Sequence, residues 1–139
     1  MADFDHDGLL EMGIVSLQEP RFRILKLNRD VQNSETHNGN SANKNSFVEI
    51  RLIGKNETAS ASKHSPRDPI GAVVKAKTGS RIRMFQLTAG EGFAVQNSRA
   101  IHIGLGDEPQ IDELEIRWPS GKVSIKENVT GNSRITVRE

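Results

Sequence analysis

Alternation of apolar and polar side chains from residue 46 to the C-terminus is the feature that most constrains the fold of this chain. Apolar residues separated by single positions recur in four segments, at 48–52, 72–76, 101–105 and 114–118. A period of two sends successive side chains to opposite faces of an extended strand, so these segments are expected to be half-buried β-strands.

Turn signals separate these segments. Thr78-Gly79-Ser80 predicts a tight turn into a partner strand at 81–87, and Pro119-Ser120-Gly121 leads into further strands at 123–125 and 135–137. No segment carries a sustained helical spacing of apolar residues. The sequence therefore predicts an all-β fold, an antiparallel β-sandwich or barrel with little helix.

The chain is expected to have three parts. Residues 1–27 hold an acidic turn and two short extended segments, Glu11–Leu17 and Phe22–Leu27. Residues 28–45 are rich in Asn, Ser and Thr and cannot bury enough apolar surface to offset the entropy of ordering, so they are expected to form a polar linker or mobile loop. Residues 46–139 are expected to form the β-domain.

Composition excludes several function classes. The chain has no Cys, which removes disulfides, Zn–thiolate clusters and thiol nucleophiles. It has one Trp, five Phe and no Tyr, and its formal net charge is +1, so a base-stacking surface or a global attraction to nucleic acid is not expected. No apolar run is long enough to span a membrane.

The acidic turn Asp3-Phe4-Asp5-His6-Asp7-Gly8-Leu9-Leu10-Glu11 is the sharpest chemical feature. Ca²⁺ prefers oxygen ligands, which a tight loop can direct to one point. The expected ligands are the carboxylates of Asp3, Asp5, Asp7 and Glu11 and the carbonyl of Leu9. An EF-hand is excluded, because Ile14 stands where its bidentate Glu is required. The alternative is a solvated acidic turn.

Two resemblances follow from these motifs. The acidic turn resembles the Ca²⁺ loop of FG-GAP/VCBS β-propeller repeats, and the strands after it look like the end of such a repeat. The segment 46–139 is similar to the ASPIC/UnbV domain of cartilage acidic protein and of bacterial secreted proteins. The matching pieces in order are Phe47–Gly54, Pro69–Val74, Gly90–Phe93, Gln96–Ser98, His102–Gly106, Ile111–Gly121 and Asn128-Val129. The stretch 55–68 departs from the family by being longer and Ser-rich.

The resemblance implies an exported protein, extracellular, at the cell surface or periplasmic, whose signal peptide lies upstream of this segment. It implies Ca²⁺ association, N-terminal β-propeller-type repeats of the parent chain as partners, and a role in adhesion, matrix, carbohydrate or protein binding. The family has no agreed catalytic activity, so the expected function is non-enzymatic.

Three further sets of residues are candidate sites. Gln96, Asn97 and Ser98 could form a polar rim for carbohydrate hydroxyls, or a strand connection. The basic residues of the predicted hairpin could form one stripe that binds anionic polymers, or a solvated face; they are Lys75, Lys77, Arg81 and Arg83. His102 points away from its inward-facing neighbours and is expected to be structural. The alternative function is an accessory enzyme, hydrolase-like or biosynthetic, that uses His102 with Asp112 or Glu91.

Overall fold

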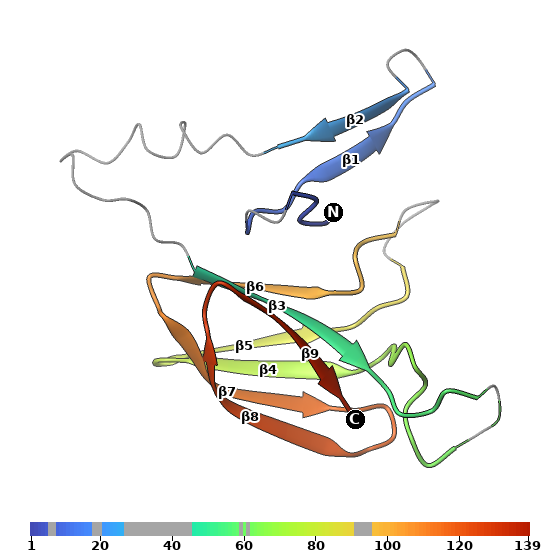
Figure 1. Cartoon of the computed structure of the whole chain (residues 1–139), viewed down its shortest axis with the longest axis vertical. Coiled ribbons are helices and arrows are strands. Elements are labelled where there is room, and N and C mark those ends of the chain that lie inside the picture. The colour runs from blue at the N-terminus through green and yellow to red at the C-terminus, as the bar shows by residue number, and fades with distance from the viewer. Residues whose placement is uncertain (6–7, 18–20, 27–45, 59, 61, 91–95) are drawn as a thin grey trace.

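The computed structural model describes residues 1–5, 8–17, 21–26, 46–58, 60, 62–90 and 96–139. Within these residues the chain forms nine β-strands and no helix. In chain order they are β1 (Met12–Val15), β2 (Phe22–Leu25), β3 (Ser46–Ile53), β4 (Val73–Thr78), β5 (Arg81–Gln86), β6 (Ile101–Gly106), β7 (Gln110–Arg117), β8 (Val123–Thr130) and β9 (Ser133–Arg138). Figure 1 shows β3 to β9 gathered in one body, with β1 and β2 away from it.

Two sheets make up the sandwich. One has the strand order β6-β3-β9 and the other the order β5-β4-β7-β8. β3 is antiparallel to β6 but parallel to β9, so Ile50 lies opposite both Ile101 and Ile135. Parallel neighbours need a long connection, and here all of β4 to β8 lies between the two strands along the chain. The predicted all-β sandwich is confirmed, with one parallel pair.

The alternating residues form the core between the two sheets. From the three-stranded sheet the buried residues are Val48, Ile50, Leu52, Ile101, Ile103, Leu105 and Val137. From the four-stranded sheet they are Val74, Ala76, Ile111, Leu114, Ile116 and Val129. Burying a side chain the size of Ile or Leu stabilises the fold by about 1.5–3 kcal/mol relative to leaving it in water. The period-two pattern therefore identifies the residues that hold the sheets together.

Turn chemistry joins the strands as expected. Gly79 has φ of 56° in the turn between β4 and β5, where a residue with a Cβ would be strained. Its amide donates a hydrogen bond of 2.7 Å to Asp112 on β7. Trp118, at the end of β7, is 3% exposed and its indole N–H donates to Ser124 Oγ over 2.8 Å. The prediction that Trp118 belongs to the core is confirmed.

The two-stranded sheet is built differently. β1 and β2 pair antiparallel, which places Met12, Ile14 and Leu25 on one face and Val15, Phe22 and Ile24 on the other. These six apolar side chains are between 37% and 81% exposed. The sequence predicted the two strands, but it did not indicate that the residues around them would leave both faces uncovered.

The expected linker at 28–45 lies outside the described residues, so the division into 1–27, 28–45 and 46–139 stays a prediction. In the part of the chain that the structure describes, no helix could cross a membrane.

Candidate functional site

The N-terminal turn brings acidic side chains together. Asp3, Asp5 and Glu11 each place one carboxylate oxygen within 4.8 Å of the others. Leu9 is partly buried in the bend that follows Gly8, and Asp7 lies outside the described residues. Three of the five predicted ligands therefore meet at one point, although they are up to eight positions apart along the chain.

Burial makes this group unusual for carboxylates. Glu11 is 1% exposed and accepts a hydrogen bond of 2.7 Å from the amide of Phe4. The Asp3 side chain is 2% exposed and accepts a hydrogen bond of 3.1 Å from the amide of Gly8. Asp5 is more open, at 38% side-chain exposure, and pairs with Lys26. Grouped carboxylates repel one another, and a cation at their centre would offset that repulsion. An all-oxygen donor set of this kind fits a hard cation such as Ca²⁺.

The acidic turn is seated on the outer face of the β6-β3-β9 sheet. Gly8 has φ of +89° and lies so close to the Phe47 ring that an added Cβ would come within 2.4 Å of it. The Phe47 ring also stacks on His102, with centroids 5.2 Å apart and an interplanar angle of 11°. Gly8 thus permits both the turn and its contact with β3, which explains the choice of glycine at this position.

Arg134 of β9 links the turn to the sheet by charge. Its guanidinium donates hydrogen bonds of 3.0 Å to Asp3 and 3.0 Å to Glu49. The hydrogen bond to Glu49 and the weaker effect of Asp3 raise the pKa of Arg134 against the opposing effect of desolvation. Its guanidinium carbon also lies 6.0 Å from the centre of the Phe47 ring. Asp3 therefore belongs to two groups at once, the acidic cluster and this ion-pair network.

His102 has carboxylate neighbours that the sequence did not suggest. Ligand atoms of His102, Asp3 and Glu49 lie within 4.8 Å of one another. His102 Nδ1 is buried and has no hydrogen-bond partner among the described residues. The predicted pairing with Asp112 is wrong, because His102 lies on the outer face of the three-stranded sheet and Asp112 belongs to β7 of the other sheet. Glu91 lies outside the described residues.

A cavity of about 310 Å³ opens beside this group. The predicted polar rim lines it with Gln96, Asn97 and Ser98, and the N-terminal residues close one side. The Met1 amine donates to Asn97 Oδ1 over 2.5 Å, and the Ser98 amide donates to the Met1 carbonyl over 3.1 Å. The three residues therefore border a hollow of small-ligand size, and Asn97 and Ser98 also make hydrogen bonds that fix this connection. Its ligand stays a prediction.

The predicted basic stripe on the β4–β5 hairpin requires a correction. Lys75 lies opposite Met84 and Lys77 opposite Ile82, whereas Arg81 and Arg83 lie opposite Thr78 and Ala76. Side chains directly opposite in an antiparallel pair share a face, so the lysines and the arginines lie on different faces of the sheet.

Arg83 is turned toward the other layer, because its guanidinium donates a hydrogen bond of 2.5 Å to the Gly104 carbonyl of β6. The hairpin thus divides its four cations between the outer surface and the edge of the core. Sequence spacing alone suggested one stripe because it does not include the pairing register.

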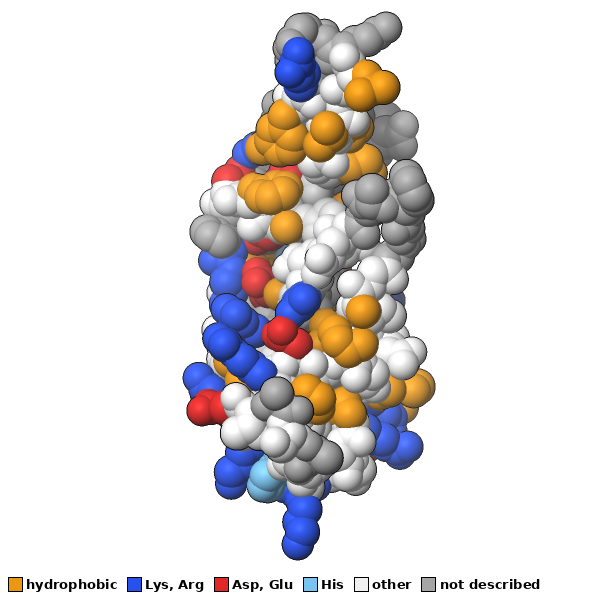
Figure 2. All heavy atoms as spheres, turned by 90° about the vertical axis from the view of Figure 1, so that its right-hand side faces the viewer, with side chains coloured by type: hydrophobic (Ala, Val, Ile, Leu, Met, Phe, Trp, Pro, Cys, Tyr) orange, Lys and Arg blue, Asp and Glu red, His pale blue; other side chains and the backbone are white. Residues whose placement is uncertain are grey.

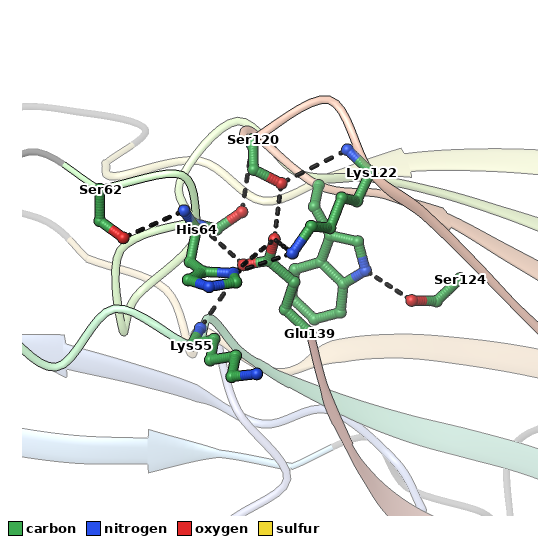
Figure 3. A network of polar contacts seen from close by, with 9 residues as sticks. Lys55, Ser62, His64, Ser120, Lys122, Ser124 and Glu139 are labelled. Carbon is green, nitrogen blue, oxygen red and sulfur yellow. Dashed lines mark hydrogen bonds and ion pairs between the residues drawn. The ribbon is translucent and has the colours of Figure 1, made fainter.

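A second polar network, at the opposite end of β3, was not found from the sequence. Figure 3 shows it around Glu139, whose carboxylate is 1% exposed and accepts hydrogen bonds of 2.6 Å from the Ser65 amide and 2.6 Å from Ser120 Oγ. Lys122 and His64 lie beside it, at 3.5 Å and 3.9 Å. Burial alone would raise the pKa of Glu139, but the hydrogen bonds from Ser120 and Ser65 outweigh it and lower the pKa from 4.5 to about 2.

This network ties three distant segments together. Glu139 follows β9, Ser65 belongs to the loop between β3 and β4, and Ser120 to the turn between β7 and β8. The Ser120 amide also donates to Ser65 Oγ over 3.2 Å. The Trp-Pro-Ser-Gly turn therefore has a structural role: Trp118 fills the core and Ser120 fixes the chain end. Through Ser65, the same contacts hold the C-terminal part of the connection between β3 and β4.

The fold and these sites define a class of protein, an all-β sandwich that carries an acidic N-terminal turn on one sheet. A family model described as ASPIC and UnbV matches residues 62–139, more than half of the chain. The chain belongs to the ASPIC/UnbV family. The match begins after β3, although β3 is the central strand of one sheet. No match was found among curated proteins.

Proposed function

We propose that this chain is a non-catalytic, Ca²⁺-associated module of an exported protein, which acts in adhesion, matrix, carbohydrate or protein binding. The acidic cluster is the observation that carries the proposal. Asp3 and Glu11 are almost completely buried and lie beside Asp5, an arrangement that needs compensating positive charge. Lys26 and Arg134 supply part of that charge from the rim.

Bound Ca²⁺ would cross-link the two ends of the acidic turn by accepting oxygen lone pairs from Asp3, Asp5 and Glu11. Residues in and around the turn also attach it to the sandwich. Gly8 seats the turn on Phe47, and Arg134 holds Asp3 toward β9. Cation binding would therefore order the N-terminal segment against the sandwich.

The exposed two-stranded sheet supports a larger parent protein. A strand pair with apolar side chains on both faces is typical of the interior of a larger sheet, because isolated two-stranded sheets are marginally stable in water. We propose that β1 and β2 complete an FG-GAP/VCBS-type repeat of a β-propeller, whose other repeats are the partners of this segment. Export and an extracellular or periplasmic location follow from the same proposal.

The cavity beside Gln96, Asn97 and Ser98 is the proposed contact with a carbohydrate or an extracellular protein. Amide and hydroxyl groups on its rim can both donate to and accept from sugar hydroxyls. Apolar walls from Phe85, Leu87 and other lining residues would cover the less polar faces of such a ligand.

Calorimetric titration of the full chain with Ca²⁺ tests the proposal. The unmodified protein is expected to bind one Ca²⁺ and to gain thermal stability, since a ligand that binds only the folded state stabilises it by mass action. Asp5→Asn is expected to weaken Ca²⁺ binding by about tenfold or more, because it removes one charged ligand. Asp107→Asn, an exposed Asp in the turn between β6 and β7, is the matched control and should leave binding unchanged.

An absence of heat and of stabilisation at millimolar Ca²⁺ would remove the cation from the proposal. Equal weakening of Ca²⁺ binding by Asp5→Asn and Asp107→Asn would show that the binding depends only on the overall charge of the protein.

A further inference from the structure

A line of cations crosses the outer face of the β6-β3-β9 sheet. Arg51 of β3 lies opposite Thr136 of β9, and two positions further on Ile53 lies opposite Arg138. Residues 51 and 53 share a face, and side chains directly opposite do as well, so Arg51 and Arg138 are diagonal neighbours on one surface. Lys55 follows directly, since its amide lies 3.5 Å from the carboxylate of Glu139, the residue after Arg138.

We call Arg51, Lys55 and Arg138 the β3–β9 basic line. All three side chains are exposed. Figure 3 shows the Lys55 amine directed away from the Glu139 carboxylate. Among the residues that the structure describes, none of the three has an ion pair, and Glu49, two positions before Arg51 on the same face, is paired with Arg134.

Lys and Arg side chains are also concentrated on one side of the molecular surface. Figure 2 looks at the end of the sandwich where the loop after β3 lies, and Lys and Arg side chains gather along one side of it with few Asp or Glu among them. The molecule as a whole is nearly neutral, with a formal net charge of +1. The positive charge on this side is therefore a local concentration and not a consequence of overall composition.

The spacing of the line suits a repeating anion. Neighbouring strands lie about 5 Å apart, and residues two apart along a strand are separated by about 6.6–6.8 Å. At this spacing, the guanidinium groups of Arg51 and Arg138 can each bind a planar carboxylate or a sulfate group through paired N–H donors. Thr136 lies opposite Arg51 and two positions before Arg138, and its hydroxyl offers a neutral hydrogen-bonding group on the same face.

Neither β3 nor β9 carries an exposed aromatic ring, and this decides between two kinds of polyanion. Single-stranded nucleic acid binds through aromatic platforms as well as cations. Phe47, the aromatic residue of β3, is partly buried and stacks on His102, and the single Trp of the chain is 3% exposed. The exposed rings of Phe4 and Phe22 belong to the N-terminal segment and not to these two strands. We infer that the β3–β9 basic line binds a linear acidic polysaccharide, sulfated or carboxylated, by ion pairing along the sheet.

This inference rests on the proposed binding role but not on the cation site, and it assigns a surface and a ligand class that the proposal leaves open. The β4–β5 hairpin, which sequence spacing favoured for anionic polymers, is not the expected surface because its cations are divided between two faces. The two surfaces can therefore be compared directly.

The experiment uses the full chain and a heparin-derived octasaccharide, with binding measured at low and high NaCl. Binding is expected at about 50 mM NaCl and should weaken with added salt, as ion-paired polyanion complexes do. The double substitution Arg51→Gln with Lys55→Gln is expected to weaken binding about tenfold and to reduce the salt dependence. The matched control is Lys77→Gln with Arg81→Gln, which removes the same residue types and the same charge from the exposed hairpin and should change binding less than about twofold.

Three outcomes would overturn the inference. The first is no binding by the unmodified protein at low salt, and the second is equal weakening by both double variants, which would indicate a response to net charge alone. The third is tighter binding of an oligothymidine of equal charge, which would assign the surface to nucleic acid. Repeating the titration in EDTA separates this result from the Ca²⁺ proposal, because the basic line needs no cation and its binding should persist there.

The competing role is protection of the edge strand β9 against pairing with other chains. Under that role, Arg138→Gln, which removes the cation on β9 itself, would cause self-association while the affinity for the octasaccharide stayed unchanged. Sedimentation of the variant decides between the two roles, and a monomeric variant with weakened binding supports the inference.

Discussion

The sandwich and the two-stranded sheet both come from short apolar strand segments, but their apolar side chains differ in burial. In β3 the alternating residues Val48, Ile50 and Leu52 are at most 4% exposed, because a second sheet covers them. In β1 and β2 the apolar residues are at least 37% exposed on both faces. The comparison shows that a strand pattern identifies the apolar residues to be buried but not the element that packs on them. Within the described residues, the two sheets of the sandwich bury each other's apolar faces, whereas no element packs on the two-stranded sheet.

The largest difference between the two regions is expected when the same side chain, an isoleucine, is truncated in each. Ile50→Ala is expected to lower the free energy of unfolding by about 3 kcal/mol, because it leaves a cavity in the core. Ile24→Ala removes the same atoms from a side chain that is 45% exposed and should cost less than about 0.5 kcal/mol. Urea denaturation of both variants gives the two values, and similar losses would show that the two-stranded sheet is covered in solution.

The Glu139 network is expected to have the next largest effect. Glu139→Gln leaves the Ser65 amide and the Ser120 hydroxyl with a neutral acceptor and should lower the free energy of unfolding by about 2 kcal/mol. Glu57→Gln, in the same loop but exposed, is the control and should be nearly neutral. Denaturant titration measures both, and a neutral Glu139→Gln would mean that these contacts do not hold the loop.

The same residue predicts a dependence on pH. Its pKa is lowered in the folded protein from 4.5 to about 2, so the folded state favours the ionised carboxylate. The resulting stability is present above the unfolded pKa and is lost as the pH falls from about 4.5 to about 2. The difference in melting temperature between the unmodified protein and Glu139→Gln should therefore shrink over this range and be constant above it.

Gly8→Ala tests the contact that joins the N-terminal turn to the sandwich. Gly8 and Gly71 both have positive φ, +89° and +92°, but a Cβ added at Gly8 would come within 2.4 Å of the Phe47 ring, whereas a Cβ added at Gly71 would meet open space. Both substitutions carry about 1 kcal/mol of backbone strain or slightly more. Gly8→Ala should in addition release the N-terminal segment, so that limited proteolysis within residues 1–26 becomes about tenfold faster. Equal proteolysis of the two variants would show that Phe47 does not hold the turn.

The smallest effect is expected at Lys26. Its pair with Asp5 is exposed, so Lys26→Gln should change the free energy of unfolding by less than about 0.5 kcal/mol. The same change removes a cation that competes for the acidic cluster, and Ca²⁺ affinity should rise about two- to fivefold. Calorimetry measures the affinity, and a fall would mean that Lys26 orders the site more than it competes for it.

The sequence predicted features that depend on near neighbours. Alternation located β3, the turn at Gly79 located the β4–β5 hairpin, and spacing placed Trp118 in the core. The candidate ligands Asp3, Asp5 and Glu11 were found in the same way, because one short loop carries them all.

What the sequence could not predict depends on pairing between distant strands. Arg51 and Arg138 become neighbours only through the parallel register of β3 and β9. Register also divided the basic residues of the hairpin, and tertiary contacts alone bring Arg134 to Asp3. Glu139 gave no local signal, since its partners Ser65 and Ser120 come from separate loops.

The parallel pairing of β3 with β9 has a consequence for how the domain is made. β3 is the first strand of the sandwich along this chain and β9 the last, so the β6-β3-β9 sheet stays incomplete until nearly the whole domain has left the ribosome. Folding of such a long-range pair is intrinsically slow, and the waiting edge of β3 can meanwhile recruit a foreign strand. We expect this domain to mature after synthesis and to depend on factors that shield nascent chains.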